Sequence, residues 1–555
     1  MSPGAGDTIP ASLLPFSILE NHNLYLDQFY YYFESNSLLP FAREIDGHLL
    51  SFYPIVTPVL ITPLYVLAFL FIKINNIPLD MFNPAFGSIV LIMGKLSSSL
   101  IASFSAIFVF LSLKELTNKR IATIVTLIFA FAANTWAISS KELWQHGLVE
   151  LFLAMSIYLV LINEKQKSKM NIIYLGLISG FFIFNRPPDS ILLIPIIYYI
   201  LTMKDRRIIY YFSFMALSSA PFFLYNMHYF GSFFGGYADL ASTINLNYKM
   251  ITGFVGLLAS PSRGIFIYTP IIIFSIAGYL KVFKLSNNIV KNFLLIFGIS
   301  ILGQILIYSA FVIWWGGWSY GPRFLTGMLP VLFIFLGLYL KDTHMNIKQK
   351  KNLLKILIFS ILLIWSIFVQ FVGAFYYPNG GWDGSPSVDL HPERLWHWND
   401  TQIMRSFNAG ITSPGNCIKT LQTIIRYTNS VSLQANNYQY VCAELGGGDG
   451  VVANRDSVGA WEKFRLIDLG AGYAALRAQN GQYLCAEGGG GGAVVANRNS
   501  IGAWETFQVV ELGSNRIALR AANGKYLCAE GGGAWPVVAN RGSIGAWESF
   551  YRTYR

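Results

Sequence analysis

Acidic side chains and a histidine stand in the first polar stretch of the sequence, ahead of a long apolar run. The stretch contains Asp7, Asp27 and His48, and it ends at Tyr53, just before the proline that begins the run. A carboxylate held at a membrane surface can act as a general base toward a lipid-linked substrate, because it can take the proton of an attacking hydroxyl. A solvated loop with capping carboxylates is the competing interpretation for each acid.

A second set of candidate residues stands between residues 314 and 323. These ten residues hold three Trp, one Tyr, three Gly and one Arg, which is denser than an interfacial aromatic belt requires. Such a segment suits a sugar beside a phosphate, because the rings stack on the sugar and the guanidinium forks onto the anion. The alternative is a purely structural loop. The side chains predicted to contact substrate are His48, Tyr53, Glu142, His146, Trp315, Trp318 and Tyr320.

Membrane helices are the elements that must position these residues. Only 12% of the 555 residues are charged, whereas soluble domains carry about 25% charge. This composition excludes a single soluble domain and a disordered chain, and 4 Cys are too few for a disulfide scaffold. Apolar runs near the spanning length of roughly 20 residues are expected at about 54–73, 88–113, 121–138, 147–162, 171–185, 189–203, 208–226, 265–280, 292–314, 324–340 and 353–373.

The distribution of basic residues predicts an orientation. The formal net charge is +11, and in a membrane protein this excess indicates basic inner loops rather than nucleic-acid binding. Lys and Arg are concentrated in every second loop, at 163–170, 204–207, 281–291 and 341–351. The alternation places the C-terminal region of a plasma-membrane protein outside the cytoplasm. The loop at 114–120 is also basic, yet two apolar stretches separate it from residues 1–50. Either one stretch lies in the interface or the charge rule fails once.

The C-terminal region repeats with a period of 43 residues. A Tyr-x-Cys-Ala-Glu motif, a Val-Val-Ala-Asn-Arg motif and a Gly-Ala-Trp-Glu motif each occur three times at this spacing. A fixed period indicates one structural unit used three times, and short runs bounded by Gly and Asn-Gly predict about four strands per unit. We therefore predict an all-β β-trefoil at 431–555. An extracytoplasmic linker at 376–430 would join it to a multi-pass α-helical membrane domain at 1–375, whose first outer loop is 1–52.

Few residues of the repeats are expected to bind a ligand. The recurring Trp461, Trp504 and Trp547 are predicted to lie in the core, and the alternative is three equivalent shallow sites that bind a repetitive glycan with avidity. The three repeat cysteines are predicted to be buried thiols, with a bridge from Cys417 to one of them as the alternative. Trp535 breaks the symmetry and is therefore the best single candidate for a ligand contact. The Asn side chains of the Asn-Arg pairs either fix turns or are further ligand candidates, and these are Asn454, Asn497 and Asn540.

Six short motifs occur in order over about residues 1–405. They are Gly6-Asp7-Thr8-Ile9-Pro10 with the rest of the first loop, Leu143-Trp144-Gln145-His146-Gly147, Asn185-Arg186-Pro187, Ser260-Pro261-Ser262-Arg263-Gly264, the run from Trp314 to Arg323, and Trp396-His397-Trp398. In this order they resemble the GT-C superfamily of integral-membrane glycosyltransferases, in the branch akin to protein mannosyltransferases and lipid A aminoarabinose transferases. The repeats resemble the fascin-like trefoils appended to bacterial secreted carbohydrate-active proteins.

The GT-C resemblance implies transfer of a sugar from a polyprenyl-phosphate donor on the outer face of the membrane. The acceptor hydroxyl attacks the anomeric carbon, and a carboxylate takes its proton. Asp7 matches the family's first-loop acid and is the implied base, with Asp27 as the second choice. The leaving lipid phosphate needs a cation, for which Arg186, Arg263 and Arg323 are the candidates and Arg323 is preferred. No cofactor is predicted, although some branches use a divalent metal, and no ligand spacing argues for one here.

Two other functions compete with glycosyl transfer. The first is a non-catalytic membrane anchor that displays a lectin-like trefoil. It is favoured because family members have a transmembrane helix before the first acid, which here follows Met1 by six residues. The second is a transporter of lipid-linked sugar, which would require charges in mid-helix, whereas the acids here stand in loops. The expected partners are the lipid-linked donor and membrane lipids, with a glycan or cell-wall polymer at the trefoil.

Overall fold

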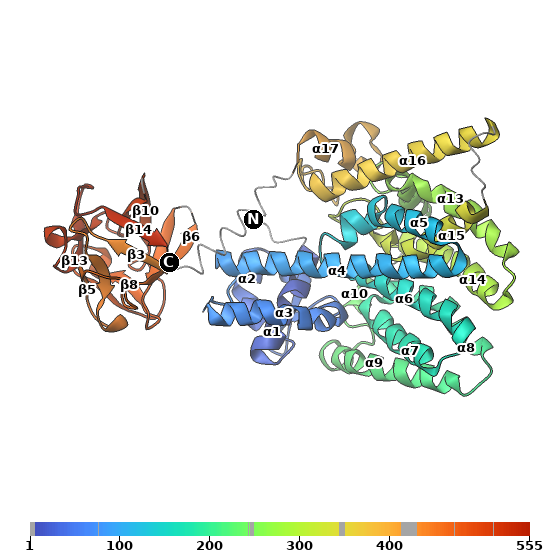
Figure 1. The fold of residues 1–555 in the computed structure, drawn as a ribbon, viewed down its shortest axis with the longest axis horizontal. Coiled ribbons are helices and arrows are strands. Elements are labelled where there is room, and N and C mark those ends of the chain that lie inside the picture. Colours follow the sequence, from blue (N-terminus) through green and yellow to red (C-terminus); the bar gives the residue numbers. More distant parts are fainter. Residues whose placement is uncertain are drawn as a thin grey trace. The chain divides into compact units, whose positions relative to one another are not determined.

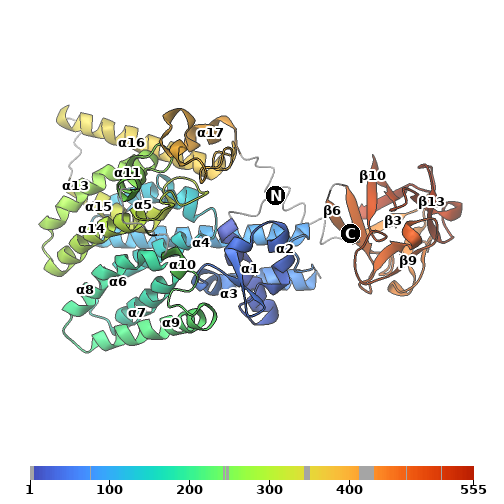
Figure 2. The ribbon, with the colours of Figure 1, turned by 180° about the vertical axis from the view of Figure 1, so that it is seen from behind.

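The computed structural model describes residues 6–75, 77–241, 244, 249–342, 350–411, 430–470, 472–513 and 515–554. The chain divides into two compact units, one of Met1–Val66 with Leu91–Pro414 and one of Leu67–Val90 with Gly415–Arg555. The first unit is mostly helical (Figures 1 and 2). It contains the candidate catalytic residues Asp7 and Asp27. The strands of the second unit form a β domain, which we describe by itself.

Short helices and one β-hairpin precede the long helices. These elements are η1 (Gly6–Thr8), α1 (Ile9–Asn21), η2 (Asp27–Phe29), α2 (Tyr30–Ser35), η3 (Leu39–Phe41), β1 (Ala42–Ile45) and β2 (His48–Ser51). Strands β1 and β2 pair antiparallel. Asp46 and Gly47 form the turn between them with φ of 52° and 79°. Asp-Gly is a favoured two-residue turn because both residues tolerate positive φ. The predicted first outer loop is therefore a folded segment.

Long apolar helices make up most of the helical unit. In the described residues seven helices are long and apolar enough to span a membrane: Val56–Ile74, Ala85–Leu116, Gln145–Gln166, Arg207–Phe230, Asn288–Ser309, Arg323–Lys341 and Leu353–Phe375. They correspond to α3 (Val56–Ile74), α4 (Pro84–Leu116), α6 (Gln145–Gln166), α9 (Arg207–Phe230), α14 (Asn288–Ser309), η8 (Arg323–Met328) with α15 (Leu329–Asp342), and α16 (Lys350–Phe375). This length and composition indicate a membrane protein.

Four of the eleven expected apolar runs form shorter or broken helices. Those at 171–185 and 189–203 are α7 (Lys169–Asn185) and η5 (Pro187–Leu193) with α8 (Ile194–Thr202). Those at 121–138 and 265–280 are α5 (Lys119–Phe131) with η4 (Thr135–Ser139), and α12 (Ile265–Tyr268), η6 (Pro270–Ile272) and α13 (Ile273–Lys281). Pro270 divides the last run, because proline has no N–H to continue the helical ladder. The connecting elements are α10 (Tyr237–Ala241), α11 (Lys249–Ala259) and η7 (Val282–Lys284).

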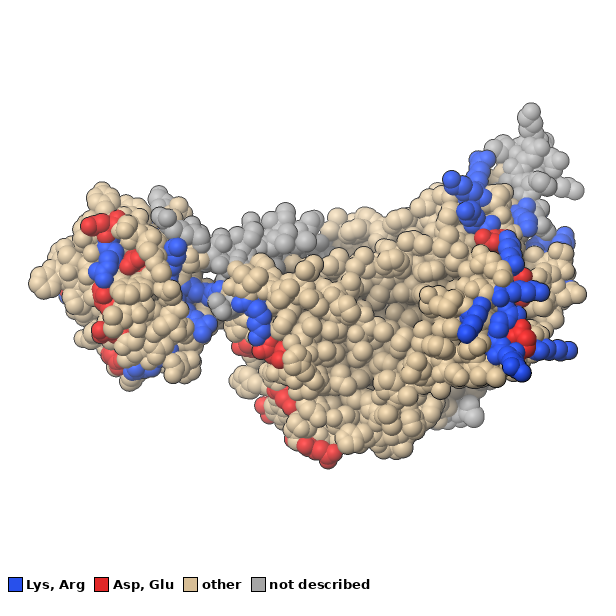
Figure 3. All heavy atoms as spheres, turned by 60° about the horizontal axis from the view of Figure 1, so that its bottom comes forward, with Lys and Arg blue, Asp and Glu red and all other residues tan. Residues whose placement is uncertain are grey.

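Basic loops that are distant in sequence meet at one end of the helical unit, where Lys and Arg gather on the surface (Figure 3). Lys165 Nζ pairs with Glu115 at 2.6 Å, and Lys341 Nζ donates to the Leu116 carbonyl at 2.8 Å. Asn287 Nδ2 donates to Glu164 in the same region. The loops around 114–120, 163–170, 281–291 and 341, which the charge pattern assigns to one face, therefore do lie together.

Residues 376–411 fold onto the helical unit, so the expected linker at 376–430 is wrong for this part. They contain η9 (Pro392–Trp396), η10 (Trp398–Asp400) and α17 (Gln402–Asn408). Trp382 is 1% exposed and donates its indole N–H to the Asp400 carbonyl at 2.7 Å. Arg394 and Arg405 both pair with the Asp400 carboxylate, at 2.9 and 2.7 Å. This segment is held by buried polar contacts rather than by an apolar run, so its sequence shows no hydrophobic pattern that would predict a folded segment. Residues 412–429, with Cys417, lie outside the described residues.

In its described residues the β domain contains twelve strands, four from each 43-residue repeat. They are β3 (Ser430–Gln434), β4 (Tyr440–Ala443), β5 (Val451–Arg455), β6 (Phe464–Gly470), β7 (Tyr473–Arg477), β8 (Tyr483–Ala486), β9 (Val494–Arg498), β10 (Phe507–Gly513), β11 (Arg516–Arg520), β12 (Tyr526–Ala529), β13 (Val537–Arg541) and β14 (Phe550–Tyr554). Six strands close a ring of antiparallel pairs in the order β3, β6, β7, β10, β11, β14 and back to β3. The other six form the hairpins β4–β5, β8–β9 and β12–β13.

The core of the β domain takes one set of apolar positions from each repeat. Phenylalanines at the start of β6, β10 and β14 are at most 1% exposed, and these are Phe464, Phe507 and Phe550. The repeat cysteines, Cys442, Cys485 and Cys528, are buried and free, as predicted. The prediction of a core position is wrong for the recurring tryptophans, because Trp461, Trp504 and Trp547 are 38%, 43% and 41% exposed. The phenylalanine three residues later fills the core in each repeat, and the indole lies on the surface.

Candidate functional site

Asp7 and Arg323 form an ion pair although they are 316 residues apart. Arg323 Nη1 donates to Asp7 Oδ2 at 2.8 Å, and each side chain is 14% exposed. The short helix η1 positions Asp7, and its Gly6 lies so close to Phe41 that a Cβ there would be 2.3 Å from the ring. Burial raises the pKa of Asp7 above its ordinary value, and the charges of Arg323 and Arg186 oppose this rise. The predicted base and the preferred phosphate-binding residue thus lie together.

Arg323 keeps unused hydrogen-bond donors. Its guanidinium lies over the ring of Trp144 at 4.3 Å. Its Nε is buried and has no hydrogen-bond partner in the described part of the chain. Gly316, at φ 77°, makes room for the side chain, because a Cβ there would lie 3.1 Å from Arg323 Nε. The guanidinium is therefore held in place by a ring and a carboxylate, and it retains N–H groups for an anion.

Arg186 is oriented by a buried polar network. Its Nε donates to the Tyr308 hydroxyl at 3.0 Å and lies 3.1 Å from Asp189 Oδ2. Its Nη1 donates to the Tyr237 hydroxyl at 3.0 Å. Gln304 and Tyr308 also donate to Asp189, at 2.7 and 2.5 Å. Asp189 and the phenols thus fix one side of the guanidinium, while Nη2 makes no hydrogen bond to any described residue.

Tyr53, Tyr237 and His146 lie around these charges. The rings of Tyr53 and Tyr237 make an edge contact with centroids 6.2 Å apart. Burial raises the pKa of both phenols, and the Asp7 carboxylate and both guanidiniums act on each of them. His146 is 1% exposed, and its Nδ1 has no partner among the described residues. We call this set the Asp7 cluster: Asp7, Tyr53, His146, Arg186, Tyr237 and Arg323.

Asp27 and His48, two further predicted site residues, form a separate pair. Asp27 Oδ2 lies 2.7 Å from His48 Nδ1, and the side chains are 45% and 42% exposed. Asp27 Oδ1 accepts the N–H of Leu49 at 2.6 Å, and the His48 ring stacks on Tyr25 at 3.9 Å. These contacts hold β2 against η2 and do not involve the Asp7 cluster. The structure therefore brings one of the two predicted acids, Asp7, to two of the three predicted phosphate-binding arginines, Arg323 and Arg186.

Arg263 does not have the free donors that a phosphate site requires. It is 0% exposed, and its Nε donates to the Trp315 carbonyl. Its Nη1 donates to the Ser262 carbonyl and to Gln402, and its Nη2 donates to the Gly317 carbonyl and to Asp383 at 2.8 Å. All five N–H groups of a guanidinium are thereby used. The expectation that Arg263 binds donor phosphate is corrected to a structural role, because it joins the 314–323 segment to residues 376–411.

The aromatic residues of the 314–323 segment that were predicted to contact substrate include two that are buried in the fold and one that is exposed. Trp315 is 8% exposed and donates its indole N–H to Asp389 at 2.9 Å. Tyr320 is 1% exposed and donates its hydroxyl to the Val369 carbonyl at 2.8 Å. Both are engaged within the fold, which favours a structural role over the predicted substrate contact. Trp318 is 53% exposed and can present its ring to a ligand. Glu142 is half-buried in the turn before α6.

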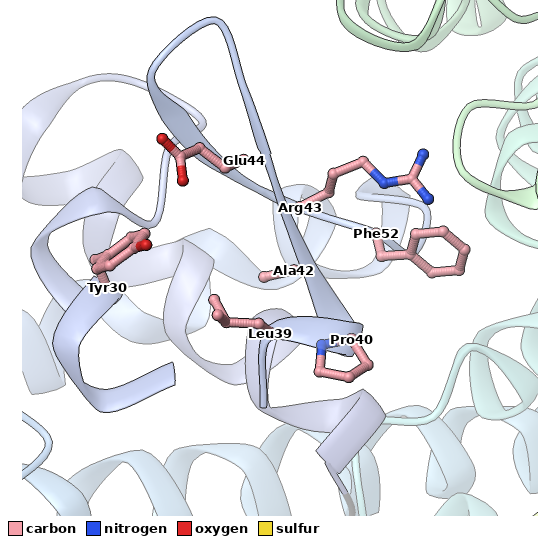
Figure 4. A pocket seen from close by; sticks show the side chains of 7 residues that line it. All are labelled: Tyr30, Leu39, Pro40, Ala42, Arg43, Glu44 and Phe52. Atoms are coloured by element: carbon pink, nitrogen blue, oxygen red, sulfur yellow. The ribbon is translucent and has the colours of Figure 1, made fainter. Parts of the chain in front are cut away.

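A surface pocket of about 430 Å³ lies in the N-terminal segment (Figure 4). Its lining residues are Tyr30, Leu39, Pro40, Ala42, Arg43, Glu44 and Phe52. The guanidinium of Arg43 lies 5.2 Å from the ring centroid of Phe52 and pairs with Asp239 at 2.6 Å. Glu44 projects on the opposite side of β1, toward Tyr30. The sequence does not reveal this pocket, because neighbouring strand residues such as Arg43 and Glu44 point to opposite faces of β1 and form no recognisable motif.

Buried polar residues in the helices were also missed. Tyr308 lies within the apolar run at 292–314 and Tyr237 lies in the loop after the run at 208–226, and neither position marks a polar network in the sequence. Glu150 lies inside α6, is 0% exposed, and accepts a hydrogen bond from Thr135 Oγ1 at 2.8 Å. An acid within an apolar span was the available signal, because such residues face the protein interior and are usually functional. In the described ranges no group of three or more His, Cys, Asp or Glu could hold a metal ion.

The Asn-Arg pairs of the β domain are engaged in the fold. Arg455 makes two bonds to Glu444, at 3.0 and 2.9 Å, and donates to Asn454 at 2.6 Å. The second repeat matches this pattern with Asn497, and in the third Asn540 donates to Glu530 at 3.3 Å. These contacts tie each strand to the preceding turn, which supports the turn-fixing alternative for the three Asn residues. Trp535, in contrast, is 64% exposed.

Comparison with known proteins gives a family match in the C-terminal part of the chain. Residues 427–524 match a family described as a domain of unknown function, DUF7910. A solved structure of a designed three-fold symmetric protein, ThreeFoil, is similar to the chain at 27% identity with a TM-score of 0.21. The similarity covers 22% of this chain and 97% of ThreeFoil. None of the curated proteins searched matches the chain.

Proposed function

We propose that the helical unit is a membrane glycosyltransferase of the GT-C type. It transfers a sugar from a polyprenyl-phosphate donor to an acceptor on the extracytoplasmic face of the plasma membrane. The observation that supports this most is the buried Asp7–Arg323 pair with Arg186 beside it. The cluster combines a carboxylate and two guanidiniums with unused donors, as a base and a phosphate site require.

The proposed reaction assigns one task to each charged group. The acceptor hydroxyl oxygen forms the bond to the anomeric carbon, and its proton passes to the Asp7 carboxylate. The bond from the anomeric carbon to the phosphate oxygen breaks, and the electron pair leaves with the lipid phosphate. Arg323 and Arg186 stabilise the charge that grows on this phosphate. Donor binding at Arg323 would weaken its hold on Asp7 and free the carboxylate to accept a proton.

The β domain is proposed to be a fascin-like β-trefoil that binds a glycan or cell-wall polymer. The support is the closed ring of six strands with three hairpins and the threefold repetition of four strands. The proposed location outside the cytoplasm rests on the alternation of basic and charge-poor loops. Membrane lipids and the lipid-linked donor are the partners proposed for the helical unit.

A reconstituted transfer assay tests the enzymatic proposal. The full chain in proteoliposomes receives radiolabelled polyprenyl-phosphate sugars, and label in lipid-free product is measured for the parent and for Asp7→Asn. Loss of the base should slow transfer on the order of 10²-fold or more. Asp239→Asn is the matched control, since Asp239 also pairs with an arginine at 2.6 Å but is 56% exposed. Full transfer by Asp7→Asn together with loss in Asp27→Asn would make Asp27 the base.

Transport of the lipid-linked sugar is the second candidate, favoured by the buried carboxyl of Glu150. A fluorescent polyprenyl-phosphate analogue in one leaflet would report transport. The transporter would be supported if the analogue reached the other leaflet with the parent chain, stayed in place when Glu150 was substituted, and yielded no transfer product. The same result would count against the transferase.

A further inference from the structure

The three repeats present equivalent indoles on the surface of the β domain. Each rests on a glycine of the preceding turn, so that a Cβ would lie 3.1 to 3.3 Å from the indole. The pairs are Trp461 on Gly446, Trp504 on Gly489 and Trp547 on Gly532. Positive φ values at these glycines, 77°, 79° and 83°, bring the turn backbone close to the ring. Each repeat therefore offers one fixed ring that is about two-fifths exposed.

The third repeat adds a second indole. Trp535 occupies the position of Asp449 in the first repeat and Gly492 in the second. Its ring stands beside Gly531, where a Cβ would lie 3.0 Å from the ring, while Trp547 stands on the next residue, Gly532. Two exposed indoles thus flank a Gly-Gly step, and this arrangement occurs in the third repeat alone among the described repeats.

The backbone of this hairpin is held by the first repeat. The N–H of Ala534 donates to the Ala453 carbonyl at 2.6 Å, and the Ala453 N–H donates to the Trp535 carbonyl at 3.3 Å. Pro536 forms an isolated bridge with Val452. The Trp535 side chain is therefore exposed, while its own backbone and that of its two neighbours are fixed. A fixed backbone lowers the conformational entropy that this segment loses when a ligand binds.

The charges beside the two indoles are compensated. Glu530 makes two bonds to Arg541, both at 2.9 Å, and Arg541 also lies 3.7 Å from Glu548. Neither indole N–H donates a hydrogen bond to a described residue, and the two side chains are 64% and 41% exposed. An indole combines a large apolar face with one polar donor. These properties favour a neutral ligand with flat apolar faces and hydroxyl groups at its edge.

We propose that Trp535 and Trp547 form one carbohydrate site for a neutral glycan with equatorial hydroxyls. Such a pyranose has axial C–H groups on both faces, which can pack on the two rings, and its hydroxyls can accept from the indole N–H groups. This proposal depends on the proposed glycan-binding role of the β domain. It places the binding in the third repeat rather than in all three repeats. In the other repeats Asp449 puts a carboxylate at the Trp535 position, and Gly492 leaves it without a side chain.

Oligosaccharide binding by the full chain in detergent tests the site. Cellohexaose and chitohexaose serve as probes in isothermal titration calorimetry. Trp535→Ala and Trp547→Ala should each weaken binding about tenfold or more, as truncation of an aromatic hot spot does. The symmetry-related Trp461→Ala and Trp504→Ala are matched controls and should change the affinity less than about twofold.

A gain-of-site variant completes the test. Gly492→Trp places an indole beside Trp504, and the backbone allows it because the contacts of a Cβ there are no closer than 3.8 Å. The stoichiometry should rise from one to two oligosaccharides per chain. Equal losses in all three recurring Trp variants, or full binding by Trp535→Ala, would overturn the single site and leave the glycan-binding role intact. If the parent chain bound neither oligosaccharide, both the Trp535–Trp547 site and the glycan-binding role of the β domain would be overturned. The proposed glycosyl transfer is tested separately, by the transfer assay of Asp7→Asn.

Discussion

The Asp7–Arg323 pair predicts a specific pattern of stability in a double-mutant cycle. Arg323 Nη1 and Asp7 Oδ2 are 2.8 Å apart. Two unit charges at about 4 Å attract each other by about 4 kcal/mol at an effective dielectric of 20, which sets the order of magnitude for this pair. Arg323→Gln leaves the Asp7 carboxylate buried without its partner and should cost about 3–5 kcal/mol. Asp7→Asn should also destabilise the protein, because it leaves the Arg323 charge buried. The double variant removes both charges, so it should be more stable than Arg323→Gln.

The pH dependence of this cycle follows from the pKa of Asp7. Burial raises that pKa, and Arg323 opposes the rise, so Arg323→Gln should raise it further. A raised folded-state pKa means that the folded protein binds the proton more tightly than the unfolded chain. The stability deficit of Arg323→Gln is therefore largest above the folded pKa and should shrink as the pH falls through it.

Thermal unfolding of the purified protein in detergent measures these effects from pH 8 down to mildly acidic pH. The exposed Arg43–Asp239 pair, with N···O 2.6 Å and side chains 47% and 56% exposed, is the matched control. Its coupling energy should be about 0–1 kcal/mol. A coupling for Asp7 and Arg323 as small as that of the control would refute a buried ion pair. A deficit that grows on acidification would refute the direction given for the Asp7 pKa.

Three other outcomes are expected. Arg263→Gln should lower thermal stability with little change in the apparent KM for the lipid donor, because every donor of Arg263 is used inside the fold; a raised KM at unchanged stability would contradict this. The three repeat cysteines should resist maleimide at pH 8 until the protein is denatured, because burial and a neighbouring glutamate raise their pKa to about 12; fast labelling of native protein would count against buried thiols. A biotin acceptor at the C-terminus should be labelled by an impermeant reagent on intact cells, and labelling only after lysis would reverse the proposed orientation.

The architecture was largely readable from the sequence because its signals are local. Apolar runs near the spanning length predicted the long helices, and the 43-residue period predicted four strands per repeat. The failures occurred where long-range contacts decide the structure. Residues 376–411 looked like a linker, since their packing depends on Arg263 reaching Asp383, 120 residues away. The recurring tryptophans looked like core residues, but glycine turns hold them at the surface and Phe464 with its equivalents fills the interior.

The three arginines predicted to bind phosphate show in the same way that long-range contacts are not visible in the sequence. Each stands in a short polar motif at the end of an apolar run. The sequence favoured Arg323 for its aromatic and Gly-rich surroundings, but it could not show how many donors each guanidinium keeps unpaired. In the structure Arg263 uses all five donors and Arg186 is fixed on one side. Within the described residues Arg323 donates to Asp7, and its Nε is unused.

A leaving phosphate is stabilised by donors that are fixed in place and still unpaired, because paired donors must first break a bond and mobile ones must first be ordered. By this criterion Arg323 comes first, since its guanidinium lies over the Trp144 ring and its Nε has no partner among the described residues. Arg186 comes second, and Arg263 is excluded. Arg323→Lys keeps the charge and loses the planar fork, so it should raise the KM for the donor and lower kcat. Arg186→Lys should have the smaller effect on kcat, and equal effects would remove the basis for this ranking.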